Sequence, residues 1–565
     1  MDESERPILW VLAAAVLCAV VLRFTGIGYG LPGVFNGDEP HYVNVAVSFG
    51  RGSLNPVHFK YPTLWMYILF GAYGVYGLAW SAFGLLHPFR EFGRHFVWHP
   101  EHFFLIGRLL AAAVSLAALV PAFLAGRRLG GPRAGAWAVA LLAASPVISE
   151  LTHAAKPDCL MLFWSAWAVW AALRYLDTGR GADLGLCSVF VGLAGSTQYT
   201  AAPLAVVVPA AWWARRLSHP GPEAPSFGQL AAWSLLMPAA FVLASPYTVL
   251  DAPAFLRGLR DNWGAYGHDA GRLAGLTVAG NFLTWAGVGS PGGVLFLAGC
   301  ARLLRERRPQ AALLLTPAVA FCLFFALQSE GGWHRYLMGI HTVLAVVAGF
   351  GAEWALTSLT AGAGRRAALH AVCAALLMAP GAWQAWRLDR DWLLVDTRNL
   401  AAAWFQEHVP AGSGVLSDLQ AESPPLRLSQ AQARRLLERT AGLGRRKYYE
   451  LMLESHPGGG WDVYQVNRDP KELHVGAWHA QASVQERAVL EPGEGLRGAL
   501  DAGIEYVVLT SNGAGAGGTS AARAYVRDVE TLGALEAEFR PEPGKIRGPV
   551  IRVYKIAGRT REGAR

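Results

Sequence analysis

The sequence is poor in charge and in cysteine. Only 16% of its 565 residues are charged, whereas ordinary soluble domains carry about 25%. None of its 6 cysteines lies after Cys373, and no two of them form a Cys-x-x-Cys pair, so neither a disulfide scaffold nor a paired-cysteine metal site is expected. Hydrophobic residues make up 53% of the chain, which also excludes a disordered or a collagen-like protein.

The charged residues that are present are unevenly distributed. Residues 389–565 contain 46 charged residues in 177 positions, whereas residues 1–388 contain 44 in 388 positions. This difference predicts a membrane-embedded body, 1–388, followed by a smaller water-soluble domain, 389–565. The net charge of +8 comes from short Lys and Arg clusters between apolar runs. Such clusters are a topology signal, so we expect no binding to nucleic acid.

Apolar stretches long enough to cross a bilayer fill the first part of the chain. A spanning helix needs about 20 mostly apolar residues, and about eleven stretches qualify: 8–27, 103–126, 133–152, 158–176, 184–197, 200–214, 228–246, 285–304, 310–329, 335–355 and 367–387. The predicted fold class is therefore mainly α, a polytopic membrane protein with a smaller exported C-terminal α/β domain. The first stretch is interpreted as an uncleaved anchor, because no small-residue cleavage site follows it.

Basic clusters predict the orientation of these helices. Cytoplasmic loops are enriched in Lys and Arg, and four clusters fall on one face if the glycine-interrupted stretch 64–86 does not span: Arg127/Arg128/Arg133, Arg215/Arg216, Arg302/Arg305/Arg307/Arg308 and Arg365/Arg366. We therefore expect 64–86 to be a juxtamembrane or re-entrant element within a first outer loop, 28–102. The N-terminus is then cytoplasmic, and the C-terminal domain is extracytoplasmic.

The C-terminal part has the pattern of a small α/β domain. Residues 399–408 have helical apolar spacing, and 504–509 and 550–556 are short β-rich runs. The segment 511–518 (SNGAGAGG) is glycine-rich but lacks the Gly-Lys-Ser/Thr ending of a phosphate-binding loop. It is therefore expected to be a flexible loop.

The first polar cluster on the predicted outer face is N36-G-D-E-P-H-Y42. Its adjacent carboxylates, Asp38 and Glu39, followed by His41, suit a general base with an orienting or metal-binding neighbour. The ordinary alternative is an N-cap acid before a helix that runs from about Val43.

Three further clusters add cations to this face. They are F59-K-Y-P-T63, H153-A-A-K-P-D158 and S329-E-G-G-W-H-R-Y336. Each has an ordinary explanation: Lys60 as an interfacial lysine, a turn at Pro157, and membrane anchoring by Arg335. Together, however, they supply cations on the face that carries the acidic pair, which suits transfer of a group from a phosphate-bearing lipid.

These four clusters, in this order, resemble the C-type membrane glycosyltransferase (GT-C) superfamily, in particular the protein O-mannosyltransferases and the lipid A aminoarabinose transferases. The matching motifs are Asp38-Glu39, Lys60-Tyr61-Pro62, Lys156-Pro157-Asp158 and Arg335-Tyr336. The resemblance covers about residues 8–390, and the tail resembles the exported domains of bacterial members. Two positions depart from the family pattern: Thr63 stands where a second proline is usual, and Lys156 where arginine is common.

The resemblance implies an inverting transfer of a sugar from a polyprenyl-phosphate donor to an acceptor hydroxyl at the outer side of the cell (inner) membrane. It implies Asp38 as the base, with Glu39 orienting the acceptor or joining a divalent cation. It implies that the donor phosphate is bound by four cationic or ionisable side chains, Lys60, Lys156, Arg335 and His334. The remaining site-lining residues would be His41, Tyr61, Asp158 and Tyr336.

The acceptor class and the cation are left open by the sequence. The acceptor could be a protein, a lipid or a glycan. No cofactor is required by the residues, and a divalent cation is possible, although His87, His95, His99 and His102 lack an ordered ligand spacing.

Two other classes of function compete with the transferase. A secondary transporter would place its ionisable residues near the bilayer midplane and would contain repeats. A noncatalytic subunit that binds a sugar-lipid would have lost motif residues, but here the Asp38-Glu39 pair is intact.

Overall fold

The computed structural model describes residues 6–84, 91–221, 224–265, 280–283, 287–326, 334–359, 363–417, 422–439, 443–466, 489–490, 496, 499–500, 503–512 and 520–556. The chain forms two compact units. We call Met1–Ile27, Arg51–Ile68 and Gly107–Asp389 the body unit. We call Gly28–Gly50, Leu69–Ile106 and Arg390–Arg565 the sheet unit, which thus includes parts of the first predicted outer loop as well as the C-terminal residues.

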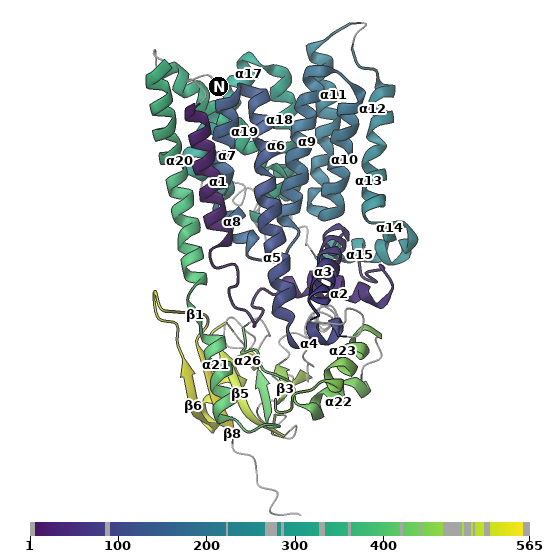
Figure 1. Cartoon of the computed structure of the whole chain (residues 1–565), viewed down its shortest axis with the longest axis vertical. Coiled ribbons are helices and arrows are strands. Elements are labelled where there is room, and N and C mark those ends of the chain that lie inside the picture. The colour runs from purple at the N-terminus through teal and green to yellow at the C-terminus, as the bar shows by residue number, and fades with distance from the viewer. Residues whose placement is uncertain are drawn as a thin grey trace, which may run out of the picture. The chain divides into compact units, whose positions relative to one another are not determined.

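The body unit is built from helices that run side by side (Figure 1). In chain order they are α1 (Arg6–Phe24), α5 (Pro100–Ala117), α6 (Leu119–Gly130), α7 (Pro132–Ala143), α8 (Pro146–Thr152), α9 (Asp158–Thr178), α10 (Gly181–Thr197), η2 (Tyr199–Val206), α11 (Val207–Ser218), α12 (Phe227–Ser234), α13 (Leu236–Ala244), α14 (Tyr247–Leu250), α15 (Ala252–Ala265), α17 (Gly289–Glu306), α18 (Arg308–Ala326), η4 (His334–Leu337), α19 (Met338–Leu359) and α20 (Ala363–Trp392). The N-terminal part of α5 and the end of α20 belong to the sheet unit.

Several of these helices have the length and hydropathy of membrane spans. Among the described residues, 5 qualify, and a pair bent by 55° would make a sixth. The spans are Pro100–Gly130, Asp158–Thr178, Phe227–Ala244, Arg308–Phe325 and His334–Ser358, with Pro132–Ala143 and Pro146–Thr152 as the bent pair. A mainly helical, multi-pass membrane protein is therefore confirmed, whereas the count of about eleven spans stays a prediction.

The glycine-interrupted stretch near residue 70 forms one continuous helix, α3 (Leu64–Ala82). It is not among the helices that qualify as spans. Three of the four glycines of the stretch, Gly71, Gly74 and Gly77, lie within this helix, whereas Gly84, with a φ of +69°, follows its end.

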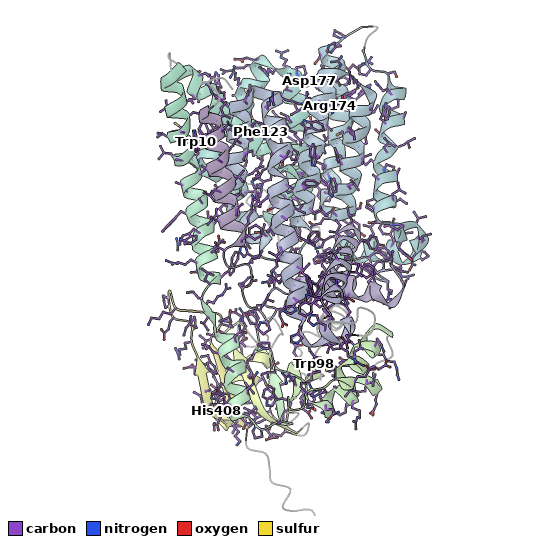
Figure 2. The ribbon with its side chains drawn as sticks, viewed as in Figure 1. Trp10, Trp98, Phe123, Arg174, Asp177 and His408 are labelled. Carbon is purple, nitrogen blue, oxygen red and sulfur yellow. The ribbon has the colours of Figure 1, made fainter. Side chains whose placement is uncertain are left out.

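Three of the four basic clusters lie at one end of the body unit. Arg128 pairs with Asp177 at 2.7 Å, Arg215 donates to the Leu176 carbonyl at 2.8 Å, and Arg307 donates to the Leu129 carbonyl at 2.7 Å. Figure 2 shows Asp177 and its neighbour Arg174 at this end of α9. The side chains of the fourth cluster, Arg365 and Arg366, lie outside the described residues.

The third polar cluster lies at the other end of the same helix. Asp158 is the first residue of α9, and Asp177 lies in its last turn. At 1.5 Å per residue these two positions are separated by about 30 Å along the helix. The body unit therefore separates the basic loops from Lys156 and Asp158, as the predicted topology requires.

Small residues allow the helices of the body to approach closely. A methyl group at Gly351 would collide with the Leu295 carbonyl of α17, and one at Gly299 would collide with the Val347 carbonyl of α19. Helices in a bilayer gain little from a hydrophobic effect between them, so close van der Waals contact is the main source of their association. The α17–α19 interface depends on these two glycines.

The sheet unit contains a mixed sheet with strand order β4-β3-β2-β5-β8-β6. The strands are β2 (Gly414–Ser417), β3 (Asp462–Val466), β4 (Val489–Leu490), β5 (Ile504–Thr510), β6 (Gly533–Phe539) and β8 (Ile551–Ile556). β4, β3, β2 and β5 run parallel, and β8 pairs antiparallel with β5 and β6. A separate parallel pair joins β1 (Val395–Asp396) to β7 (Ile546–Arg547).

Helices cover both faces of this sheet. Tyr506 and Val508 of β5 belong to one apolar core, with α21 (Thr397–His408), α22 (Gln430–Arg439) and α23 (Leu443–Glu454). Val507 and Leu509 belong to the other, with α26 (Ser520–Leu532). The expected helix at 399–408 and the expected strands at 504–509 and 550–556 are present as α21, β5 and β8. Most of the expected loop at 511–518 lies outside the described residues.

Segments from the first predicted outer loop complete the sheet unit. They are α2 (Glu39–Ser48), η1 (Phe49–Arg51), the later part of α3, and α4 (Phe92–Trp98). Val97 of α4 lies in the apolar core with α23. Arg94 pairs with Glu454 at 2.9 Å, and Trp98 donates to Ser455 at 2.8 Å.

Gly351→Ala should destabilise the body unit, because the added methyl group must displace the Leu295 carbonyl. Overpacking of this kind typically costs about 1–3 kcal/mol. Thermal unfolding of the detergent-purified protein measures the effect. Gly74→Ala is the matched control, since its methyl group meets nothing within 4 Å. Equal melting temperatures for the two variants would contradict the close α17–α19 approach.

Candidate functional site

The first polar cluster belongs to the sheet unit, at the start of α2. The helix begins at Glu39, four residues earlier than the expected start near Val43, because Pro40 fits the first helical turn. Asp38 occupies the N-cap position, but its side chain makes no capping hydrogen bond. Its backbone N–H instead donates to Asn36 Oδ1 at 3.1 Å. Helix capping therefore does not account for the Asp38 carboxylate.

The two adjacent carboxylates differ in exposure. Asp38 is half-buried, whereas Glu39 is completely buried. Glu39 interacts electrostatically with the buried Tyr73 of α3, whose hydroxyl donates to the Phe103 carbonyl at 3.1 Å. His41 is also buried and packs edge-on against Tyr42. Of the two carboxylates, Asp38 is therefore the more exposed.

The second cluster lies in the body unit, just before α3, and its backbone is held from several directions. The carbonyl of Phe59 accepts from Tyr199 Oη at 3.3 Å, and that of Lys60 accepts from Asn262 Nδ2 at 2.6 Å. The Lys60 ammonium lies 5.6 Å from the centre of the Tyr61 ring. These contacts fix the backbone that carries Lys60.

The second and third clusters are joined by a hydrogen bond. Trp65 Nε1, in the first turn of α3, donates to the Ala155 carbonyl at 3.1 Å. Ala155 directly precedes Lys156, whose residue is only 6% exposed. The Asp158 carboxylate is completely buried, and neither of its oxygens has a hydrogen-bond partner among the described residues. A buried carboxylate of this kind is costly unless a donor or a cation reaches it.

The fourth cluster lies against the helix that leads into the third. η4, which carries His334 and Arg335, contacts α8. Tyr336 is buried and stacks on Phe325 with ring centres 5.5 Å apart, which is a packing role. The Arg335 guanidinium lies 5.3 Å from the centre of the Tyr336 ring. Residues 329–333 of this cluster lie outside the described residues.

The body unit thus brings the second, third and fourth clusters into one neighbourhood. The links are Trp65 to Ala155 and η4 to α8. Asp38, Glu39 and His41 belong to the sheet unit. The segments that carry Lys60, Lys156 and Arg335 are thus linked within the body unit, and Lys156 lies two positions before the buried Asp158 at the start of α9.

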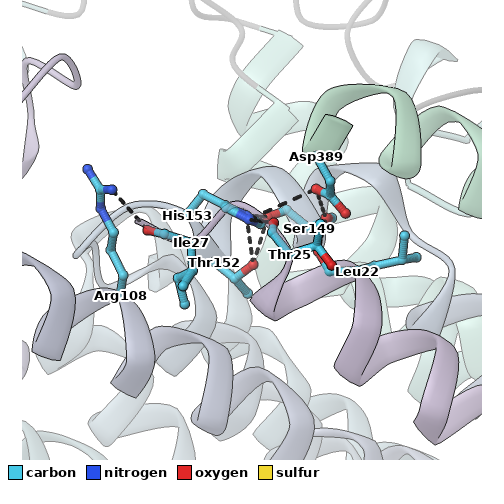
Figure 3. Close-up of polar contacts among 8 residues, drawn as sticks. All are labelled: Leu22, Thr25, Ile27, Arg108, Ser149, Thr152, His153 and Asp389. Atoms are coloured by element: carbon cyan, nitrogen blue, oxygen red, sulfur yellow. Dashed lines mark hydrogen bonds and ion pairs between the residues drawn. The ribbon is translucent and has the colours of Figure 1, made fainter. Parts of the chain in front are cut away.

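A buried polar network around His153 was missed by sequence reasoning (Figure 3). The two ring nitrogens lie 2.7 Å from carbonyl oxygens, Nδ1 from that of Ser149 and Nε2 from that of Thr25. Carbonyls only accept hydrogen bonds, so these two contacts suit a ring that carries protons on both nitrogens. Asp389 Oδ1 lies 4.0 Å from Nε2 and accepts from Ser149 Oγ at 3.1 Å.

The same network holds the chain just after α1. Arg23 donates to the Leu142 carbonyl at 3.1 Å, and Arg108 donates to the Ile27 carbonyl at 3.0 Å. Arg23 is 1% exposed. Arg23 lies inside the first apolar run of the sequence, and this position could have pointed to the network. A charged residue at membrane depth is rare and usually has a specific partner.

Histidines of the predicted outer loop form a hydrogen-bonded group in the sheet unit. His95 Nε2, His102 Nδ1 and Tyr76 Oη lie 3.0 Å from one another. Burial, followed by the charges of His102 and His99, lowers the pKa of His95 to about 4, so this ring is neutral at pH 7. Among the described residues no group of three His, Cys, Asp or Glu side chains could hold a metal ion. His87 lies outside that part of the chain.

Comparison with known proteins relates the chain to membrane glycosyltransferases. Residues 104–246 match the family described as dolichyl-phosphate-mannose-protein mannosyltransferase. No curated protein matches the sequence. Among solved structures, ArnT of Cupriavidus metallidurans bound to undecaprenyl phosphate is 14% identical, with a TM-score of 0.55 over 97% of this chain and 98% of that one. The Archaeoglobus fulgidus oligosaccharyltransferase in the apo form is 15% identical, with a TM-score of 0.51 over 89% of this chain and 70% of that one.

The likeness to these two structures shows a shared fold, and the family match over residues 104–246 agrees with the resemblance carried by the motifs.

Asp389→Asn should destabilise the body unit, because it removes the carboxylate beside the buried His153. Removing one partner of a buried pair typically costs about 3–5 kcal/mol. The double variant His153→Gln/Asp389→Asn should recover part of the loss, since the two sites are coupled. Melting temperatures in detergent measure both effects.

Asp177→Asn serves as the control for this experiment. It removes the same chemical group from an exposed pair with Arg128, where the expected cost is about 0–1 kcal/mol. An Asp389→Asn protein as stable as the Asp177→Asn protein would show that His153 carries no buried charge.

Proposed function

We propose that the protein is an inverting glycosyltransferase that moves a sugar from a polyprenyl-phosphate donor to an acceptor hydroxyl on the extracytoplasmic face of the cell membrane. The observation that carries this proposal is that the segments bearing Lys60, Lys156 and Arg335 are linked within the body unit, by the Trp65–Ala155 hydrogen bond and by the contact of η4 with α8. A related fold, ArnT of Cupriavidus metallidurans, was solved with undecaprenyl phosphate bound.

The three cations, with help from His334, bind the donor phosphate in this proposal. As the bond from the sugar to the phosphate breaks, negative charge grows on the phosphate oxygens. Fixed cations in a site of low dielectric stabilise that charge without reorganising. Lys156 is only 6% exposed, so its charge is weakly screened by water. It acts as a point charge, because lysine lacks the planar fork of arginine.

Asp38 is the general base in this proposal. An inverting transfer needs a base on the side of the sugar opposite the leaving phosphate, and Asp38 is the carboxylate of the first cluster that is exposed in part. With an ordinary pKa of about 4, a carboxylate is a weak base for an alcohol, so it takes the proton as the new bond forms. Glu39 orients the acceptor or joins a divalent cation.

Asp158 contributes to donor recognition in this proposal. Its buried carboxylate has no hydrogen-bond partner among the described residues, and a sugar hydroxyl is a suitable donor to it. Tyr61, Tyr336 and His41 line the site as packing groups.

The positions of these residues favour a transferase over a transporter. Glu39 and Asp158 are first residues of helices, and Arg335 lies in the short η4 helix before α19. A secondary transporter would instead use ionisable residues of discontinuous helices near the bilayer midplane.

The proposal includes a topology and an acceptor class. About eleven helices within residues 1–388 span the inner membrane, the N-terminus is cytoplasmic, and residues 389–565 are exported. The acceptor is a hydroxyl of a protein, a lipid or a glycan at the outer surface. Labelling membranes of cells with and without the protein with radiolabelled polyprenyl-phosphate sugars identifies the macromolecule that gains the sugar.

Asp38→Asn should abolish transfer while donor binding is retained, because the amide keeps the shape but cannot take a proton. Loss of a positioned base typically costs about 10²–10⁴-fold in rate. The assay is transfer of labelled sugar from polyprenyl-phosphate donors by the purified protein in vesicles. Asp177→Asn, in the last turn of α9, should retain full activity. Turnover by the Asp38→Asn protein at the parent rate would remove Asp38 from this role.

Lys156→Ala should weaken donor binding, because it removes a charge-assisted contact to the phosphate. Such a contact is worth about 1.5–3 kcal/mol, or at least about tenfold in the apparent donor constant. Lys156→Arg should retain most of the affinity, and Lys545→Ala, at an exposed surface position, should have no effect. An unchanged donor constant for Lys156→Ala would refute the phosphate role of this residue.

A further inference from the structure

The loop that precedes Asp38 packs against C-terminal residues of the same unit. Residues 28–36 lead from α1 to α2, and they belong to the sheet unit together with residues 390–565. Phe35 is the central contact of this loop. The Arg398 guanidinium, from the first turn of α21, lies 3.6 Å from the centre of its ring.

Arg398 is itself held firmly in place. Its Nε and NH2 donate to the two oxygens of Asp396 at 2.8 and 2.7 Å. Arg398 is 6% exposed and Asp396 is 4% exposed. A bidentate pair of this kind fixes the plane of the guanidinium, and a desolvated guanidinium over an aromatic face is an attractive contact.

Two glycines of the loop, Gly30 and Gly33, lie close to different edges of the Phe35 ring. A Cβ atom at Gly30 would lie 2.7 Å from Phe35 Cδ2, and one at Gly33 would lie 2.7 Å from Cε1 and Cζ. Gly30 also has a φ of +75°, which favours glycine. The ring is therefore confined by glycine backbone and by Arg398.

A second aromatic contact lies at the start of the same loop. Tyr29 stacks on Trp392 with ring centres 5.3 Å apart, and the Arg547 guanidinium lies 5.1 Å from the centre of the Tyr29 ring. Arg547 is held by the same carboxylate, Asp396, at 3.5 Å. Asn399 Nδ2 also lies 3.5 Å from the Gly30 carbonyl.

Only Asn36 and Gly37 separate Phe35 from Asp38. Three residues span at most about 10 Å, and the Asp38 N–H is tied to Asn36 Oδ1. A fixed position of Phe35 therefore restrains the backbone position of Asp38. A base that is displaced by 1 Å from its productive position can lose about 100-fold in rate, so the anchoring of this loop matters to the reaction.

We infer that Arg398 is a positioning residue for Asp38: through Phe35, the C-terminal part of the sheet unit holds the loop that carries the base. This inference rests on the proposed function of Asp38, and it gives residues 390–565 a role in the transfer step that is separate from acceptor binding.

The test uses two glycine variants of the loop in the full-length protein. Gly33→Ala places a methyl group against the Phe35 ring, whereas Gly28→Ala places one where nothing lies within 4 Å. Gly33→Ala should lower kcat by about 10- to 100-fold with an unchanged apparent donor constant, and Gly28→Ala should leave both unchanged. Neither variant alters the Asp396–Arg398 pair, so the fold of the C-terminal part is preserved.

Loop order is measured separately from activity. A nitroxide attached to the cysteine introduced by Gly37→Cys reports on the loop, because position 37 is exposed and an added side chain meets nothing within 4 Å. Its spectrum should show greater mobility in the Gly33→Ala background than in the Gly28→Ala background. The signal from the 6 native cysteines is measured without Gly37→Cys and subtracted.

Variants of Arg398 provide a second test of the inference. Arg398→Ala should increase the mobility of the nitroxide and lower kcat. Arg398→Lys should show smaller changes in both quantities, and Arg552→Ala should leave both unchanged. Arg552 is the matched control, because it also makes charge-assisted bonds within the sheet unit, to Glu538 at 2.7 Å and Glu530 at 3.0 Å.

The outcomes separate this inference from the proposed function. An immobile nitroxide in the Gly33→Ala and Arg398→Ala proteins, or an equal loss of rate in Arg552→Ala, would overturn the positioning role even if Asp38→Asn is inactive. A mobile nitroxide and reduced kcat would support it. A mobile nitroxide with an active Asp38→Asn protein would overturn Asp38 as the base, and with it any effect of Arg398 on catalysis.

Discussion

The cost of removing a charged group from water determines where this chain places its ionisable side chains. The helices of the body are apolar, and a charge among them is tolerated only when a partner is built in. His153 and Asp389 form such a pair, and Arg23 is held by the Leu142 carbonyl. Several other charges lie at helix ends, with Arg128 and Arg215 near one end of α9 and Lys156 and Asp158 at the other. The separation of a positively charged loop surface from a polar reaction end follows from this single constraint.

Much of the body could be predicted from the sequence, because hydropathy and basic clusters act over short segments. The shared site of Lys60, Lys156 and Arg335 stays a prediction, and within the body unit the segments that carry them are linked by the Trp65–Ala155 hydrogen bond and by the contact of η4 with α8. Helix boundaries were predicted less well. α2 begins at Glu39, because proline is favoured in the first turn of a helix and Pro40 lies there. The pattern of apolar residues had predicted a later start, near Val43.

The composition of the sheet unit could not be predicted from the sequence. Its contacts join residues that are very distant along the chain, such as Arg94 with Glu454, which are 360 positions apart. Neither partner has a sequence signal of its own, because an arginine in one helix and a glutamate in another are ordinary. The boundary predicted at residue 389 came from charge density, which reports on solubility. The compact units are defined by packing, and two earlier segments of the chain pack into the sheet unit.

The anchoring of the loop before Asp38 converges on a single group. Asp396 orients Arg398, which contacts Phe35, and also Arg547, which contacts Tyr29. The two aromatic contacts of the loop thus share one acid, Asp396. Loss of that acid in a natural variant would loosen the contacts of both Phe35 and Tyr29 at once, so tolerance to sequence change in this region should be lowest at Asp396.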